Sequence, residues 1–438
     1  MKLKKYPRES LVLVLIALAT LPIFAQLDAQ DVTRIGLAES VLTRGTLNID
    51  PYREQTIDLA HTRGHWYSDK APGISLILLV PVGLLHGVDA IIGRGHEPVL
   101  WKRPFRLWLS RVFASGFAFL LLVFLVGRVG EGLAEGTGAL CAVVLALGTI
   151  AGSLSASMFG HLANTVMLFA GFVLATRAET NRAWLWVGLL AGAAVLFEYP
   201  GAIGAIALVG YAAWRSGRRA ALAVIAGGIP AAVVLGGYDW LAFGSPLSLS
   251  YKYVSKLFSA EQEQGFFGVS FPTLHGLWTV LFDTTGLLVI SPILALGTYG
   301  LVVLGRQARR EAVLAASVAS AFIVMTMGYV LPDGGSSPGP RFATAALPFL
   351  ILGLPFAYRR WKWLTLALAV YSIAIATYDE MTWTLYDGKL QFHGWPQTIY
   401  SIARLPVGAG AAAVLVPVTV AALIVTYSAA RDHTSVTR

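Results

Sequence analysis

Residues 66–92 read WYSDKAPGISLILLVPVGLLHGVDAII, a polar and aromatic stretch followed by the apolar run 74–92. A helix that crosses a bilayer needs about 20 apolar residues, so this run is close to the length of a crossing. Whether it crosses decides on which side of the membrane every later loop lies. The charges along the rest of the chain favour one of the two answers.

Apolar residues dominate the whole chain. Of its 438 residues, 56% are hydrophobic and 13% are charged. This excess excludes a soluble enzyme, a disordered chain and a fibrous repeat. A dozen membrane-spanning helices would take about 240 residues and would account for most of the apolar content. The single cysteine, Cys141, excludes a disulfide framework and a cysteine-based metal site.

The N-terminus carries four basic residues, Lys2, Lys4, Lys5 and Arg8, before the apolar run 11–27. This pattern fits either a cleaved signal peptide or an uncleaved signal anchor. We favour the anchor because the chain continues as a membrane protein. Both alternatives put the next segment on the extracytoplasmic side.

Basic clusters separate the later apolar segments. These segments are 106–127, 137–157, 162–176, 183–197, 201–214, 220–241, 286–304, 311–330, 342–357, 363–378 and 403–427. The clusters are Arg215/Arg218/Arg219, Arg306/Arg309/Arg310 and Arg359/Arg360/Lys362. Short basic loops stay in the cytoplasm, so all three clusters belong on the side of the N-terminus. They fall there together only if 74–92 does not cross.

The sequence therefore predicts an all-α, polytopic membrane protein with about twelve crossings in a single transmembrane domain, 1–438. Its long external loops are 28–105, 243–285 and 379–402, and the first contains 74–92 as an interfacial or re-entrant helix. Both termini are expected in the cytoplasm, and the plasma (inner) membrane is the expected location. The net charge of +9 lies in short clusters, which is typical of membrane orientation and not of a nucleic-acid-binding face.

The first external loop opens with acidic and basic residues, namely Asp28, Asp31, Arg34 and Glu39. Helical spacing puts several of them near one face, so one interpretation is a solvated interfacial helix held by ion pairs. The other is that one carboxylate is a general base. Partial desolvation at a membrane surface raises the pKa of such a group toward a useful range.

Two cations stand directly before apolar helices. Lys70 precedes the run 74–92, where a cation beside a helix N-terminus makes an anion site, although a snorkelling lysine is the alternative. Arg341 ends the glycine-rich turn 333–341, DGGSSPGPR. Its planar guanidinium suits phosphate, and the glycines permit close approach of the backbone to a ligand.

Further polar residues lie at the outer ends of apolar segments. Arg111 sits inside one segment, where an arginine is costly and is either functional or held in an ion pair, for instance with Glu198. His161 and Asn164 mark one outer turn, and Glu198 and Tyr199 mark another. Helix caps explain these residues as well as substrate binding does.

Three cations, Lys70, Arg111 and Arg341, are thus expected at the outer leaflet with acidic residues close by. That mixture suits a phosphate carried on a lipid and a neutral hydroxyl that must lose its proton. The chain contains no Walker A loop, no HExxH, no nucleophile elbow and no dinucleotide fingerprint between a strand and a helix.

These residues resemble motifs of the GT-C superfamily of integral-membrane glycosyltransferases, in particular its protein O-mannosyltransferase and lipid A aminoarabinose transferase branch. The acidic motif of the first external loop is similar to residues 31–34, although Val32 replaces its second acidic residue. The Lys-Pro-Pro element before a non-crossing helix resembles residues 70–72. Two further basic positions match Arg111 and Arg341. Asn164 stands where the branch often has Asp, and Glu198 where the aminoarabinose transferase has Lys.

The resemblance implies transfer of a sugar from a polyprenyl-phosphate donor to an acceptor hydroxyl on the extracytoplasmic face, with inversion. Asp31 would be the general base, with Asp28 as second choice. Lys70, Arg111 and Arg341 would bind the departing phosphate and stabilise its charge. The resemblance implies no cofactor and no divalent metal, and the acceptor is a glycan, a glycolipid or a protein.

Substrate contacts are expected from a further set of residues, Arg34, His161, Asn164, Glu198 and Tyr199. The rival hypothesis is a transporter or flippase for lipid-linked sugars without catalysis. It predicts a cavity open to both sides and charges midway along the helices. The charges of this chain concentrate near the outer helix ends instead, which favours the transferase.

Overall fold

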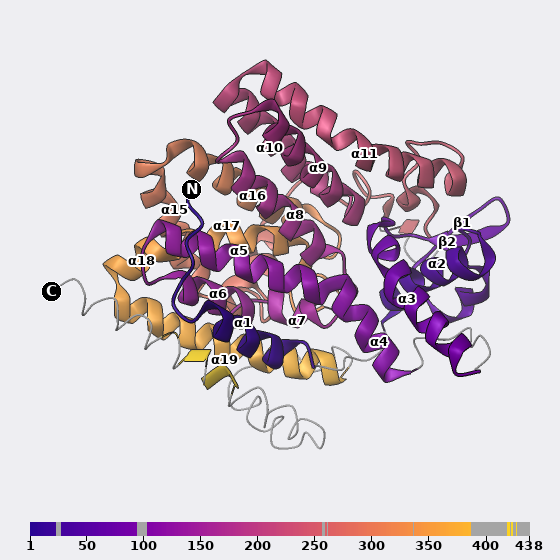
Figure 1. The fold of residues 1–438 in the computed structure, drawn as a ribbon, viewed down its shortest axis with the longest axis horizontal. Helices are drawn as coiled ribbons and strands as arrows, with labels where there is room; N and C mark the ends of the chain where they lie inside the picture. The colour runs from indigo at the N-terminus through magenta and orange to yellow at the C-terminus, as the bar shows by residue number, and fades with distance from the viewer. Residues whose placement is uncertain are drawn as a thin grey trace.

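The computed structural model describes residues 1–22, 28–93, 103–255, 259–260, 262–335 and 337–386, with a few positions between 418 and 426. Most of the predicted crossing 403–427 and most of the loop 379–402 lie outside these residues. The described chain forms a helical bundle and a smaller lobe at one end of it (Figure 1). The lobe contains α2 (Ala29–Arg44), η1 (Asp50–Gln55), β1 (Leu59–Thr62), β2 (His65–Ser68) and α3 (Gly73–Ile91).

The bundle is built from the remaining helices. They are α1 (Glu9–Thr20), α4 (Pro104–Arg111), η3 (Val112–Gly116), α5 (Phe117–Leu133), α6 (Gly138–Leu147), α7 (Ala151–Ser155), α8 (His161–Ala175), α9 (Asn181–Phe197), α10 (Gly201–Ser216), α11 (Arg218–Phe243), η4 (Ser250–Tyr253), α13 (Leu274–Phe282), α14 (Leu287–Ile290), α15 (Ile293–Gln307), α16 (Arg309–Gly328), η5 (Arg341–Ala346), α17 (Leu347–Ile351), α18 (Leu354–Arg360) and α19 (Lys362–Tyr386). One large apolar core fills the bundle, and a second lies between the lobe and the adjoining helix ends.

Four helices are long and apolar enough to cross a membrane in the described part of the chain. They are α3, the continuous helix Pro104–Leu133, α11 and α16. The bent pairs α13–α15 and η5–α18 raise this number to six, and several helices of 10–17 residues are also apolar. These helices are the signature of a membrane protein. The count of about twelve crossings stays a prediction.

The mostly helical fold is confirmed, and the described chain adds one short antiparallel hairpin that was not predicted. β1 and β2 pair with Leu59 opposite Ser68 and Thr62 opposite His65. The two turn residues, Arg63 and Gly64, have φ angles of 53° and 81°. Positive φ at both central positions is typical of a type I′ turn, whose backbone twist matches that of the flanking strands.

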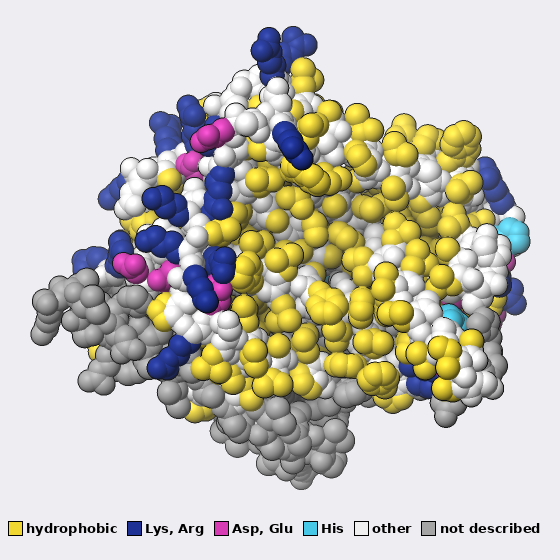
Figure 2. All heavy atoms as spheres, in the orientation of Figure 1, with side chains coloured by type: hydrophobic (Ala, Val, Ile, Leu, Met, Phe, Trp, Pro, Cys, Tyr) yellow, Lys and Arg dark blue, Asp and Glu magenta, His cyan; other side chains and the backbone are white. Residues whose placement is uncertain are grey.

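The N-terminus and the basic helix ends share one end of the molecule. Arg177 Nε donates to the carbonyl oxygen of Met1 (2.5 Å), and Arg215 Nη1 donates to that of Ala175 (2.7 Å). Figure 1 places the N-terminus beside α15 and near α18, which end in the other two basic clusters. Lys and Arg side chains gather at this end in Figure 2, and a broad apolar band separates them from the lobe.

Both the first and the last turn of helix α3 lie at the end of the molecule that carries the lobe. A Cβ added to Gly73 at its start would meet the carbonyl oxygen of Leu196 at 2.5 Å, at the end of α9. Near its other end, Asp89 pairs with Arg106 at the start of α4. From there α4 and α5 lead toward the basic end. Since α3 has the length and composition of a span, its not crossing stays a prediction.

Candidate active site

A cavity of about 300 Å³ lies between the lobe and the bundle. Its walls come from the start of α2, the hairpin, η4, the first residues of α8 and η5, and the α9–α10 turn. Its lining residues are Asp28, Ala29, Gln30, Ile57, Asp58, Asp69, Lys70, His161, Glu198, Tyr251, Val254, Gln262, Tyr329, Leu331, Gly335, Arg341 and Phe342. Five of the residues that the sequence marked, namely Asp28, Lys70, His161, Glu198 and Arg341, therefore face one space.

Asp28 is the N-cap of α2 and stands at the cavity wall. Its Oδ1 accepts the backbone N–H of Gln30 (2.7 Å), and its own N–H donates to Asp31 Oδ2 (2.9 Å). This reciprocal capping satisfies backbone donors at the helix start. Burial raises the pKa of Asp28 to about 6, and Asp31 adds to the rise, whereas Gln30 and Arg341 limit it. The carboxyl is therefore poised to exchange a proton near neutral pH.

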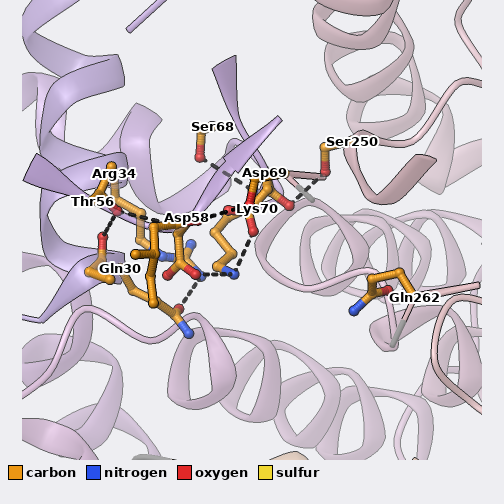
Figure 3. A network of polar contacts seen from close by, with 12 residues as sticks. Gln30, Arg34, Thr56, Asp58, Ser68, Asp69, Lys70, Ser250 and Gln262 are labelled. Atoms are coloured by element: carbon orange, nitrogen blue, oxygen red, sulfur yellow. Dashed lines mark hydrogen bonds and ion pairs between the residues drawn. The ribbon is translucent and has the colours of Figure 1, made fainter. Parts of the chain in front are cut away.

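Lys70 is held between two carboxylates. Its Nζ lies 3.0 Å from Asp69 Oδ2 and 3.3 Å from Asp58 Oδ1 (Figure 3). Burial alone would lower the pKa of Lys70, but these two neighbours raise it above its ordinary value. Lys70 thus keeps its positive charge, which the carboxylates of Asp58 and Asp69 largely neutralise.

The hairpin register explains this cluster. Leu59 pairs with Ser68 as the outermost pair, so the residue before Leu59 and the residue after Ser68 end the two strands side by side. These residues are Asp58 and Asp69. The sequence analysis named neither as a candidate, and the signal for both was the short hairpin that it missed.

Arg341 differs from Lys70 in its neighbours. No carboxylate of the described residues lies within ion-pair distance of its guanidinium. Its guanidinium lies over the rings of Phe159 and Phe342, with Cζ 4.7 and 5.2 Å from the ring centroids. Its Nε is buried and has no hydrogen-bond partner in the described part of the chain. Stacking fixes the guanidinium plane and leaves its donors for a ligand.

Glu198 connects the cavity to helix α2. Its Oε1 accepts from Arg34 Nη2 (3.1 Å) and lies 3.9 Å from His161 Nδ1. Burial would raise the pKa of Glu198, but His161, Arg34 and further cations nearby hold it below its usual value. Arg34 does not line the cavity, and its remaining Nε and Nη1 have no hydrogen-bond partner among the described residues.

Two other predicted residues lie behind the wall. The hydroxyl of Tyr199 is 3.1 Å from Ser250 Oγ, which donates to the carbonyl oxygen of Asp69 (2.7 Å). Tyr199 thereby fixes the segment that carries Asp69. Asn164 is buried, and its Oδ1 has no hydrogen-bond partner in the described chain. Neither Tyr199 nor Asn164 lines the cavity.

Arg111 and Asp31 also stand outside the cavity lining. They pair with each other, which differs from the Arg111–Glu198 pair that the sequence analysis considered. A π-helical turn, η3, follows Arg111 directly; such turns are frequent at functional sites. Three further polar or aromatic lining residues, Gln30, Gln262 and Tyr329, were not predicted, because segments distant in sequence bring them together.

No protein-family model matches this chain, and no curated protein matches it. Two solved structures of an oligosaccharyltransferase from Archaeoglobus fulgidus are similar. One is the archaeal enzyme AglB in complex with an inhibitory peptide and a dolichol-phosphate (12% identity), and the other is the apo form (11% identity). Each has a TM-score of 0.49, and each alignment covers 93% of this chain.

The chain spans 59% of the length of those two chains. The chemistry of this chain is therefore argued from its own side chains.

Proposed function

We propose that this protein is an integral-membrane glycosyltransferase that uses a polyprenyl-phosphate sugar as donor. The observation that carries the proposal is that Asp28 and Arg341 line one cavity. Arg341 has no carboxylate at ion-pair distance in the described residues, and the pKa of Asp28 is raised to about 6. One group is thus fitted to hold a phosphate, and the other to take a proton.

The reaction follows from these two roles. The acceptor hydroxyl gives its proton to the Asp28 carboxylate while its oxygen forms a bond to the anomeric carbon. The bond from that carbon to the phosphate oxygen breaks, and the lipid phosphate leaves with the electron pair. Direct displacement of this kind inverts the anomeric centre. Arg341 stabilises the charge that grows on the leaving phosphate, with Lys70 as a second positive group.

The proposal exchanges the order of the two acidic candidates. Asp31 is committed to Arg111 and to the backbone of Asp28, whereas Asp28 faces the cavity. We therefore assign the base to Asp28, and Asp31 becomes the residue that positions it. The proposal requires no cofactor and assigns no metal ligands.

The side of the membrane follows from the two ends of the bundle. Helix α8 runs from His161 at the cavity to Ala175, whose carbonyl oxygen contacts Arg215 at the basic end. Its 15 residues span about 22 Å at 1.5 Å per residue. Basic clusters mark the cytoplasmic side, so we place the cavity on the extracytoplasmic side of a plasma (inner) membrane.

Reconstituted full-length protein tests this function. Vesicles of phosphatidylcholine and phosphatidylglycerol would be supplied with polyprenyl-phosphate hexoses, pentoses and amino sugars as donors and with glycan, glycolipid and peptide acceptors. Release of free polyprenyl phosphate would be measured with and without acceptor. We expect one class of donor to be consumed. Asp28→Asn should lower turnover by about 10²- to 10⁴-fold. Asn also caps helices well, so the start of α2 should keep its structure and the donor lipid should still bind.

Glu263→Gln is the matched control, since it removes an exposed carboxylate that does not line the cavity. Turnover near that of the unmodified protein in Asp28→Asn would refute the assignment of the base. Movement of intact donor across the vesicle bilayer without release of polyprenyl phosphate would instead establish the transporter.

A further inference from the structure

A second cavity, of about 350 Å³, adjoins the first at Asp28. Its lining residues are Asp28, Ala29, Val32, Glu54, Gln55, Thr56 and Ile57. Three of these, Asp28, Ala29 and Ile57, also line the first cavity. Asp28 therefore lines both cavities.

The two cavities differ in the cations that line them. The first cavity is lined by two cations, Lys70 and Arg341, together with four acids, Asp28, Asp58, Asp69 and Glu198. The residues that line the second include the acids Asp28 and Glu54 and no Lys, Arg or His. Glu54 lies 2.9 Å from Arg53, but their side chains are 82% and 55% exposed. Exposed pairs of this kind interact weakly. The second cavity therefore offers no lining cation to an anion and suits neutral or cationic groups.

The wall of the second cavity is fixed before any ligand arrives. The hydroxyl of Tyr52 in η1 donates to Glu39 Oε2 of α2 (2.8 Å). Thr56 Oγ1 donates to the carbonyl oxygen of Ala29 (2.8 Å), between the two cavities. Asp50 Oδ1, at the start of η1, accepts the backbone N–H of Trp66 (2.7 Å). These bonds tie η1 to both α2 and the hairpin, so the cavity needs little ordering to bind.

We propose that the second cavity is the acceptor site, and that it takes a hydroxyl-bearing group without negative charge. The proposal rests on the proposed function and deepens it. With the donor phosphate beside Arg341, an acceptor in the second cavity meets Asp28 from the side opposite to the phosphate. Its hydroxyl proton passes to Asp28, its oxygen bonds to the anomeric carbon, and the phosphate departs toward Arg341 with the electrons of the broken bond.

Cysteine labelling of the full chain tests the charge of this cavity. Cys141 is buried, so Cys141→Ala gives a background in which Gln55→Cys, at an exposed lining position, is the reporter. The cationic trimethylammonioethyl and the anionic sulfonatoethyl methanethiosulfonates are the probes. Relative to free cysteine, we expect the cationic reagent to gain about tenfold over the anionic one. Asp28→Asn should reduce this preference, and equal relative rates at Gln55→Cys would overturn the proposal.

Protection by sugars tests the ligand class. Methyl glucoside, glucosamine and glucuronate serve as neutral, cationic and anionic probes of similar size. We expect the first two to slow labelling of Gln55→Cys and glucuronate to have no effect. Protection by glucuronate equal to that by methyl glucoside, or protection by none of the three, would show that the cavity is not the site proposed.

A cysteine reporter in the first cavity distinguishes failure of the acceptor-site proposal from failure of the proposed function. Gln262 lines that cavity, so Gln262→Cys should be protected by undecaprenyl phosphate. Protection there with failure at Gln55→Cys would reject the acceptor site and keep the donor site. Loss of protection at Gln262→Cys would reject the donor site itself.

Discussion

Asp31 and Arg111 form a buried ion pair, with 2.5 Å between Asp31 Oδ2 and Arg111 Nη2. The two residues are only 1% and 3% exposed. The same carboxylate oxygen accepts the backbone N–H of Asp28 (2.9 Å). The pair thus joins the start of α2 to the end of α4, and it fixes the backbone that presents Asp28 to the cavity.

Removing one partner of this pair should destabilise the fold. Arg111→Met removes the positive partner of the buried Asp31 carboxylate. Breaking a buried pair in this way typically lowers the free energy of unfolding by about 3–5 kcal/mol. The double variant Asp31→Asn/Arg111→Met should lose less than the sum of the two single variants. Chemical denaturation in detergent, followed by tryptophan fluorescence, measures the difference. Strictly additive losses would mean that the two side chains do not interact in solution.

The activity should depend on pH through Asp28. A general base works only when deprotonated, and the pKa of Asp28 is raised to about 6 by burial and by Asp31. The value of kcat/KM should therefore rise with pH below about 6 and level off above it. Asp58 raises and Arg341 lowers the same pKa, so Arg341→Met should move the inflection upward. A profile that stays flat from pH 5 to about 8 would contradict this role.

Arg341 should govern donor affinity. A hydrogen bond to a charged group contributes about 1.5–3 kcal/mol, so Arg341→Met should raise KM for the donor by about ten- to a hundredfold. Arg341→Lys keeps the charge but loses the planar fork, and it should recover only part of the affinity. Arg310→Met, at the basic end of the bundle, is the control. Equal KM values for Arg310→Met and Arg341→Met would remove Arg341 from the phosphate site.

The sequence pointed to the cavity through residues beside helix starts. Asp28, Lys70, His161 and Arg341 each stand at or just before such a start, where chain topology alone determines the end of the bundle that they reach. Chain topology alone was enough to predict that these four residues lie at the same end of the bundle. This is why hydropathy and charge were sufficient for these positions.

Ion-pair partners could not be predicted in the same way. Arg111 has Asp31 as its partner, and Glu198 has Arg34, because the rotation of α2 against α4 and the α9–α10 turn selects among several acids at one level. The pairing of Lys70 with Asp58 depends on hairpin register, which the Arg63-Gly64 turn sets. Periodicity in an apolar sequence carries little information on either.

The position of α3 leads to a last prediction, on topology. Its start packs against the end of α9, and its Asp89 pairs with Arg106 of α4, so both ends should lie on the extracytoplasmic side. In a Cys141→Ala background, Ile91→Cys and His65→Cys should react with an impermeant maleimide added to intact cells, whereas Arg310→Cys should react only after permeabilisation. If Ile91→Cys instead behaves like Arg310→Cys, α3 crosses the bilayer, and the predicted side of every later loop is reversed.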